Sequence, residues 1–287
     1  MRKNYLDRGY AAGVAMLSVI VLSAQLIIMP ALGNEGEQSD AAKNLRTQIS
    51  DVPWDPTALL EEDKIIYGDD NRIDVYQATD PNRIAWAAAT CALVSADRLT
   101  DNGDGTYTLA TGAYQRNGYP PCVGEPFANQ PTAAFCSGFK VAEDIIATAG
   151  HCVESGELPD VRFVFGFDMF DANTPELIFD ADQIYTGTAI IARRYTDDYD
   201  YAVIRVDKPI TVANSLPLRT SGTVAIDTQV GIIGHPSGLP KKIAFGKTTL
   251  VQENSDKGYF TANLDAYGGN SGSPVFDAAT GTVEGIL

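Results

Sequence analysis

The stretch Ala147-Thr-Ala-Gly-His-Cys152 ends an apolar run in small residues and presents His151 directly after them. The chain has only 2 His, so His151 is one of two candidates for a general base. Taken alone, a single histidine is more often structural than catalytic. Its interpretation therefore depends on the groups that other stretches supply.

Two further stretches resemble catalytic turns. Asp197-Asp-Tyr-Asp-Tyr-Ala-Val-Ile204 is an acidic turn that leads into a strand, on which Ala202, Ile204 and Val206 share one face. Gly268-Gly-Asn-Ser-Gly-Ser-Pro274 frames a serine with glycines that let a substrate backbone approach closely. Alone, the aspartates are most simply a solvated loop and the glycines a turn.

Together, the three stretches supply the groups of nucleophilic catalysis. Attack of a serine on a carbonyl needs a base, an anion that orients the base, and amide donors for the oxyanion. Ser271 would be the nucleophile, His151 the base and Asp200 the anion, and the N–H groups of Gly269 and Ser271 would form the oxyanion hole. Asp200 is chosen because it directly precedes the strand, and Ser271 is chosen over Ser273 because its N–H joins that of Gly269.

These motifs resemble the chymotrypsin-like (trypsin-like) serine peptidases, whose marks are T-A-G-H-C, D-x-A-[VIL] and G-[DN]-S-G-[SG]-P. Within that superfamily the chain is most similar to the bacterial glutamyl-endopeptidase-like branch. The matching stretches are Gly268-Gly-Asn-Ser-Gly-Ser-Pro-Val-Phe276, Gly234-His-Pro-Ser-Gly238 and Ile65-Ile-Tyr-Gly-Asp-Asp-Asn-Arg72. The resemblance covers residues 65–287 and implies that His235, in its Gly-rich turn, is structural.

The resemblance implies an all-β fold of two six-stranded antiparallel barrels with the active site in the cleft between them. The first barrel would carry His151 and Asp200, and the second would carry Ser271. Since Leu287 falls inside a strand that continues in relatives, we expect the second barrel to be incomplete and the domain to be truncated at its C-terminus.

The hydrophobic pattern of the chain predicts many short strands. Apolar or alternating runs bounded by turn residues predict strands, among them residues 84–94, 144–149, 161–167, 230–233 and 272–276. Such spacing is typical of antiparallel barrels or sandwiches. Asp101-Asn-Gly-Asp-Gly105 predicts a hairpin turn, and it matches a calcium loop poorly because the downstream acidic ligand is missing.

The chain has 4 Cys, which allow three pairings by arithmetic alone. None forms a CxxC pair, so structural zinc is not expected. In an oxidising compartment disulfides are the default. The family resemblance implies a bridge between Cys136 and Cys152 beside the candidate base, which leaves Cys91 and Cys122 to pair with each other.

The specificity pocket is predicted from the residues just before the nucleophile. Asp265 occupies the position that forms the pocket floor in trypsin-like relatives, where a carboxylate pairs with Arg or Lys. Glutamyl-specific relatives instead use a hydroxyl residue and a His, where this chain has Ala266 and Leu287. We therefore expect a weak preference for cleavage after Arg or Lys over Glu.

The amino-terminal region predicts export. Residues 1–33 combine basic residues, an apolar run and small residues, which are the marks of a signal peptide, or of an anchor if they are not cleaved. Residues 34–64 are polar and acidic and fit a pro-segment of a zymogen, removed at Lys64–Ile65. In digestive relatives an Asp before the nucleophile pairs with the freed ammonium. This chain has Asn270 there, so that ion pair is not expected.

Composition narrows the function further. With Lys+Arg 21 and Asp+Glu 37, the formal net charge is −16, which argues against nucleic acid as a partner because phosphate binding needs clustered basic residues. The resemblance implies a secreted or periplasmic serine endopeptidase that acts on proteins or peptides, with no cofactor and no metal. The alternatives are a non-catalytic binding module on a protease fold and an esterase on the same scaffold.

Overall fold

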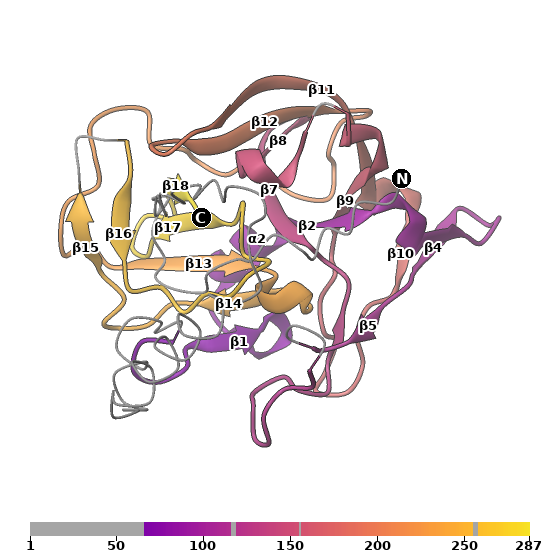
Figure 1. The fold of residues 1–287 in the computed structure, drawn as a ribbon, viewed down its shortest axis with the longest axis horizontal. Helices are drawn as coiled ribbons and strands as arrows, with labels where there is room; N and C mark the ends of the chain where they lie inside the picture. Colours follow the sequence, from indigo (N-terminus) through magenta and orange to yellow (C-terminus); the bar gives the residue numbers. More distant parts are fainter. Residues whose placement is uncertain (1–65, 116–118, 155, 255–257) are drawn as a thin grey trace, which may run out of the picture.

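The computed structural model describes residues 66–115, 119–154, 156–254 and 258–287. The predicted signal peptide (residues 1–33) and pro-segment (residues 34–64) lie outside the described residues. The largest element is a closed antiparallel barrel (Figure 1). In barrel order its six strands are β11 (Ile184–Tyr195), β12 (Asp200–Val206), β8 (Ile145–Thr148), β7 (Cys136–Ala142), β2 (Thr90–Ser95) and β9 (Val161–Phe165).

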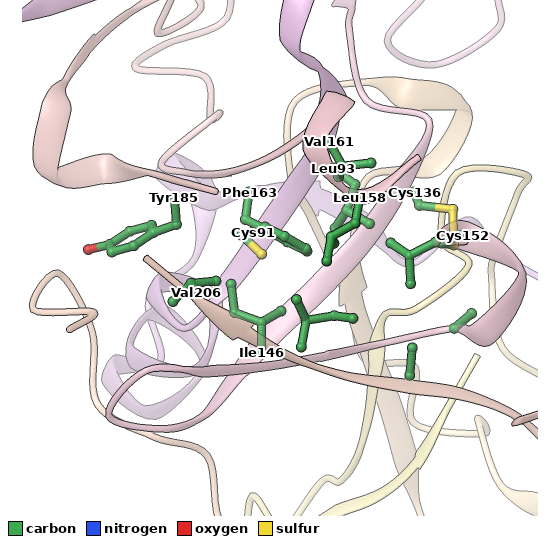
Figure 2. Close-up of a cluster of buried hydrophobic side chains, with 14 of the residues drawn as sticks. Cys91, Leu93, Cys136, Ile146, Cys152, Leu158, Val161, Phe163, Tyr185 and Val206 are labelled. Atoms are coloured by element: carbon green, nitrogen blue, oxygen red, sulfur yellow. A yellow bond between two sulfur atoms is a disulfide. The ribbon is translucent and has the colours of Figure 1, made fainter. Parts of the chain in front are cut away.

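Apolar side chains from all six strands fill the barrel interior (Figure 2). Strand β12 shows the predicted alternation, because Ala202, Ile204 and Val206 are buried in this core whereas Val203 and Arg205 are not. Burying such side chains stabilises the fold by roughly 1.5 to 3 kcal/mol each for the larger aliphatic residues. The alternation therefore fixes the register of β12 and, with it, the place of the residue at which the strand begins.

The second unit contains two sheets around a shared core. The larger sheet has the order β1 (Arg72–Asp74), β14 (Lys242–Ala244), β13 (Val230–Gly234), β17 (Pro274–Asp277) and β18 (Val283–Ile286). The smaller sheet pairs β15 (Val251–Asn254) with β16 (Phe260–Ala262). Among the described residues these strands do not close into a barrel. The predicted all-β class is thus confirmed, with one closed six-stranded barrel and a second unit of two sheets.

The two units share a third cluster of buried side chains. Phe139 and Ala147 come from the barrel, and Ile233, Ile243 and Phe276 come from the second unit. Because this cluster is continuous, displacing one unit relative to the other would expose apolar surface. The junction between the units is therefore a packed interface that can hold catalytic groups from both sides.

A buried ion pair attaches β1 to this sheet. Lys242 Nζ lies 2.6 Å from Asp74 Oδ1 and also donates to Gln130 Oε1 and Pro240 O. Burial lowers the pKa of Lys242 to about 8, although the carboxylate of Asp74 opposes this shift. Strand β1 is thereby held in place, and it carries the segment that precedes it toward the candidate site.

The strand predicted over residues 84–94 is only partly correct. The structure forms helix α2 (Pro81–Ala88) first and begins β2 at Thr90. Asp80 caps the helix by accepting from the N–H of Asn82, and Pro81 occupies the first turn, where a missing N–H costs nothing. The cap and the alanines that follow it outweigh the apolar character of the run.

The predicted hairpin turn at Asp101–Gly105 is confirmed. It joins β3 (Leu99–Asp101) to β4 (Thr106–Leu109), which pair antiparallel. Asp101 accepts from the N–H of Gly103, and Asp104 accepts from the N–H and hydroxyl of Thr106. These carboxylates are therefore engaged in closing the turn.

The cysteine prediction is correct for one pair and wrong for the other. Cys136 and Cys152 form a disulfide with a Cα–Cα distance of 6.2 Å. Cys91 and Cys122 are both free thiols, so the predicted bridge between them is absent. Cys91 is fully buried on β2 and faces the barrel core, where burial raises its pKa, whereas Cys122 lies exposed in a loop.

The remaining elements are short. They are the strands β5 (Gly112–Ala113), β6 (Pro131–Thr132) and β10 (Ile178–Asp180), and the 3-10 turns η1 (Val75–Gln77), η2 (Ala96–Arg98), η3 (Gly150–Cys152), η4 (Leu158–Asp160), η5 (Ala181–Gln183) and η6 (Pro236–Gly238). In the part of the chain that the structure describes, no helix has the length and apolarity needed to cross a bilayer.

Candidate active site

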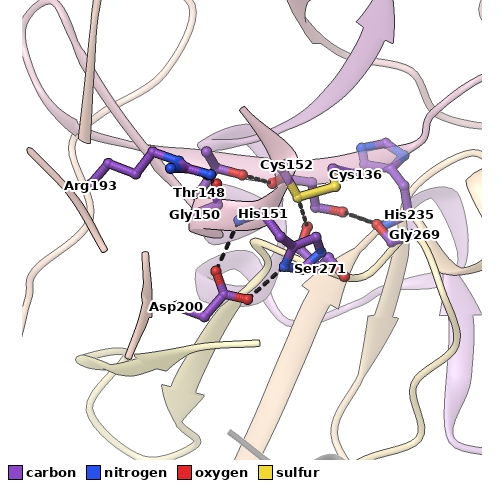
Figure 3. The surroundings of a disulfide bond; sticks show 11 residues. Cys136, Thr148, Gly150, His151, Cys152, Arg193, Asp200, His235, Gly269 and Ser271 are labelled. Carbon is purple, nitrogen blue, oxygen red and sulfur yellow. Dashed lines mark hydrogen bonds and ion pairs between the residues drawn. A yellow bond between two sulfur atoms is a disulfide. The ribbon is translucent and has the colours of Figure 1, made fainter. Parts of the chain in front are cut away.

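His151 and Asp200 meet at one end of the barrel. His151 lies in η3, directly after β8, and Asp200 begins β12, which pairs with β8. His151 Nδ1 lies 2.5 Å from Asp200 Oδ2, and the backbone N–H of His151 donates to Asp200 Oδ1 at 3.0 Å (Figure 3). Both carboxylate oxygens therefore bind the same residue, which orients the imidazole.

Gly150 makes this close approach sterically possible. A Cβ at this position would lie 2.2 Å from the backbone oxygen of Arg194 and 3.0 Å from Asp200 Oδ1. The carbonyl of Gly150 accepts from the Nε of Arg193 at 2.7 Å. The residue before His151 is thus held by a side chain from β11, and it has no room for a side chain of its own.

Ser271 comes from the second unit but lies against the barrel. It sits between β16 and β17, and its carbonyl accepts from the N–H of Ser137 on β7 at 2.8 Å. The same carbonyl oxygen lies 3.7 Å from Cys152 Sγ, next to His151 (Figure 3). Ser271 is half-buried, whereas Ser273, the rejected candidate, is fully buried. The structure thus brings the three predicted side chains to one junction.

The glycines beside Ser271 are required by the backbone. Gly269 has φ +95°, and a Cβ there would lie 2.5 Å from the carbonyl oxygen of His235. Gly272 has φ +87°, and a Cβ there would lie 2.1 Å from Ser137 O. Within the described residues neither the N–H of Gly269 nor that of Ser271 donates a hydrogen bond. Two amides are therefore available to an anion.

His235, the second histidine, is structural, as the family resemblance implies. It is fully buried, stacks on Phe167 at 5.8 Å between ring centroids, and its Nδ1 pairs with the carbonyl of Leu239 at 3.0 Å. Burial lowers the pKa of His235 well below its usual 6.5, and the nearby charge of Lys241 adds to this effect. His235 is therefore a neutral core residue at physiological pH.

Asp265, the predicted pocket floor, has its carboxylate occupied by donors from another segment. Its side chain is buried, Oδ1 accepts from the N–H of Tyr67 at 2.8 Å, and Oδ2 accepts from the N–H and Nδ2 of Asn71 at 2.8 and 2.9 Å. The carboxylate is thus engaged by backbone and amide donors of the segment before β1. Ala266, the other predicted pocket residue, is half-buried and packs against the core of the second unit.

The same segment makes a second contact with the loop that carries Ser271. The guanidinium of Arg72 lies 4.4 Å from the centroid of the Tyr267 ring and forms an ion pair with Asp70 at 2.7 Å. Burial raises the pKa of Tyr267 to about 12, so this phenol stays neutral. Residues 67–72 therefore contact this loop at Asp265 and at Tyr267.

Two supporting residues escaped prediction from sequence. Ser137 and Arg193 bind the backbone of the Ser271 loop and of the His151 turn, respectively. The only local sign of the role of Ser137 is that a hydroxyl residue stands near the start of a largely apolar strand. The sequence around Arg193 contains no sign of its role. Their hydrogen-bond partners lie on other segments, and only the packing of the fold brings them together.

A comparison with known protein families identifies the family of this chain. The trypsin-like peptidase domain family matches residues 136–286, and the chain belongs to this family. The family resemblance stated from the motifs is thereby confirmed. The chain is accordingly a peptidase by family, with the candidate residues His151, Asp200 and Ser271 inside the matched range.

Individual relatives are distant. An extracellular metalloprotease of Bacillus subtilis (strain 168) is 23% identical over 255 residues, which cover 85% of this chain and 74% of that protein. A Glu endopeptidase in complex with MPD is 20% identical with a TM-score of 0.45, covering 77% of this chain and 86% of that chain. The VesB protease of Vibrio cholerae is 16% identical with a TM-score of 0.47, and the match covers 76% of this chain and 59% of that chain.

The name of the Bacillus relative includes a metal. Among the described residues, one cluster of potential ligands lies together, namely Cys136, His151 and Cys152, with ligand atoms within 4.8 Å of one another. Both sulfurs are joined in the disulfide, so neither is available as a thiolate ligand and His151 is left as the single donor of this cluster. The donor set therefore does not fit a metal centre.

Replacing Asp265 should cost stability. In Asp265→Ala three donors of residues 67–71 lose their acceptor, so we expect the free energy of unfolding to fall by about 3 kcal/mol at roughly 1 kcal/mol per bond. Asp69→Ala, which removes an exposed carboxylate from the same segment, should change it by less than about 0.5 kcal/mol. Urea unfolding of both variants makes the comparison. Unchanged stability of Asp265→Ala with loss of cleavage after Arg or Lys would restore the pocket-floor interpretation.

The buried His235 should make the protein sensitive to acid. Below its usual pKa of 6.5 the unfolded chain gains a proton at this residue and the folded chain does not, so stability is lost as pH falls through that value. Between about pH 7.5 and about pH 5 the wild type should lose up to about 2 kcal/mol more than His235→Asn, which cannot titrate. Urea titrations at both pH values measure this difference, and equal losses in the two proteins would contradict it.

Proposed function

We propose that the protein is a serine endopeptidase that cleaves proteins or peptides through an acyl-enzyme. The observation that carries this proposal is the double contact between the Asp200 carboxylate and His151, with the Ser271 backbone held beside the same turn. A solvated acidic loop would not aim both carboxylate oxygens at one histidine. The trypsin-like peptidase family supports the same conclusion.

Each group has a defined step in this mechanism. Ser271 Oγ attacks the carbonyl carbon while His151 accepts the hydroxyl proton, and the carbonyl π electrons move to the oxygen. The N–H groups of Gly269 and Ser271 bind that oxyanion. As the tetrahedral intermediate collapses, His151 gives the proton to the leaving amine, and Asp200 holds the imidazole throughout. Water then repeats the sequence on the acyl-enzyme and releases the acid.

The preference for Arg or Lys is not part of this proposal. It depended on Asp265, whose carboxylate is occupied by Tyr67 and Asn71. Ala266 offers no charge and no hydrogen-bonding side chain. Kinetics on matched Arg, Lys and Glu peptide substrates therefore address specificity independently of the chemical mechanism.

Removing the nucleophile should abolish hydrolysis. Ser271→Ala deletes one half-buried hydroxyl, so we expect peptide hydrolysis to fall by ~10⁴- to 10⁶-fold while the unfolding midpoint stays within about 2 °C. Ser273→Ala serves as the matched control in the same loop and should keep most activity. A fluorophosphonate probe should label the wild type and Ser273→Ala but not Ser271→Ala.

Three outcomes would decide between the proposed activity and its alternatives. Retained peptide hydrolysis in Ser271→Ala would refute the mechanism. Probe labelling with hydrolysis of esters alone would indicate an esterase. Absence of both labelling and hydrolysis in the wild type would indicate a binding module on a protease fold.

We further propose that the chain is exported and then processed between Lys64 and Ile65. The acidic residues 34–64 precede the segment whose Tyr67 and Asn71 amides are anchored on Asp265, so a cut at this bond would leave the anchored part in place. Amino-terminal sequencing of active protein from the culture medium or periplasm should read Ile-Ile-Tyr-Gly. A start at Asn34 in fully active enzyme, or retention of residues 1–33, would contradict this scheme.

A further inference from the structure

Ser137 is a fully buried serine at a point where three segments meet. It is the second residue of β7, directly after the disulfide-bonded Cys136, and it is 0% exposed. A buried hydroxyl in a strand is costly unless it is hydrogen-bonded. The partners of this side chain therefore explain why a serine is placed here.

All of its polar atoms are used, and two of them hold the loop of the nucleophile. The Ser137 N–H donates to Ser271 O at 2.8 Å, and its hydroxyl donates to Gly269 O at 2.9 Å. The hydroxyl oxygen accepts from the N–H of His235 at 2.9 Å, and the Ser137 carbonyl accepts from Thr148 Oγ1 at 2.7 Å. One residue of the barrel thus binds the carbonyls of both residues assigned to the oxyanion hole.

We propose that Ser137 is a positioning residue that aligns the oxyanion hole, an inference that rests on the proposed serine peptidase activity. Gly269 lacks a side chain and has φ +95°, so its peptide planes could rotate at low cost without outside contacts. The Ser137 hydroxyl fixes the carbonyl of Gly269, and the N–H of Ser237 fixes the carbonyl of Gly268. The Gly269 N–H lies between these two anchored carbonyls, so its direction is set.

The chain from His235 through Ser137 to Gly269 also links the two units. The His235 N–H polarises the hydroxyl by donating to it, which strengthens the bond that the hydroxyl makes to Gly269 O. Ser137 follows Cys136, whose disulfide partner Cys152 follows His151. Strand β7 therefore holds both the turn of the base and the loop of the oxyanion donors. Loss of the hydroxyl should therefore affect the transition state more than substrate binding.

The test compares Ser137→Ala with Ser137→Thr, which keeps the hydroxyl. We expect Ser137→Ala to lose about 10- to 100-fold in kcat, below the loss for deleting an oxyanion donor outright, with KM changed by less than about 3-fold. Its affinity for a peptide boronic acid, which forms a tetrahedral adduct on Ser271, should fall in parallel with kcat/KM. Ser137→Thr should restore most of the kcat.

Thr90→Val is the matched control for stability. Thr90 is another fully buried hydroxyl residue of the barrel, and its Oγ1 bonds Trp86 O at 3.2 Å outside the site. This variant should lose stability without a loss in kcat. If it loses kcat to the same degree as Ser137→Ala, the role of Ser137 is merely structural and the proposal is overturned.

A second variant of similar side-chain volume keeps the test decisive if Ser137→Ala misfolds. Ser137→Cys keeps the size of the side chain but has a weak donor, so it should also lose at least about 10-fold in kcat, with the Cys136–Cys152 bridge verified by peptide mapping. Wild-type kcat in Ser137→Ala or Ser137→Cys overturns this inference alone. A wild type that neither hydrolyses peptides nor is labelled at Ser271 overturns the proposed function and this inference with it.

Discussion

The bond between the Asp200 carboxylate and His151 is the constraint on which the site depends. It forms only if the end of β8 and the start of β12 lie at the same end of the barrel. The antiparallel register of these strands, in which Ala202 faces Thr148, provides that arrangement. The register in turn follows from the burial of alternate residues of β12, because a slip by one position would turn its apolar face outward. The geometry of the candidate site is therefore a consequence of core packing.

The second unit is brought to this pair by apolar and polar contacts of different kinds. The shared cluster around Phe139, Ile233 and Phe276 supplies non-directional attraction between the units. Directional contacts are made by the N–H and hydroxyl of Ser137, which bind the loop of Ser271. Apolar burial brings the units together, and the hydrogen bonds determine which backbone atoms face one another.

Predictions from sequence succeeded where the signal was local. The alternation in β12 and the turn at Asp101–Gly105 each lie within a few residues, and the structure has both features. Predictions failed where the partner of a side chain lies on a segment far away in the sequence. Cys91 is a free thiol in the barrel core whereas Cys122 is a free thiol in an exposed loop, and Asp265 binds amides 198 and 194 residues away. The strand predicted from residue 84 was a local error, because the cap at Asp80 was present in the sequence.

The loop of residues 265–273 shows how such distant partners prepare a site. At its start, Asp265 is bound by the segment before β1, and near its end the carbonyls of Gly269 and Ser271 are bound by Ser137. Anchors on both sides limit the backbone freedom that its glycines would otherwise have. In the described structure the amides of Gly269 and Ser271 are left without acceptors between these anchors. An oxyanion would supply the acceptor that they lack, without the entropic cost of ordering the loop at the moment of reaction.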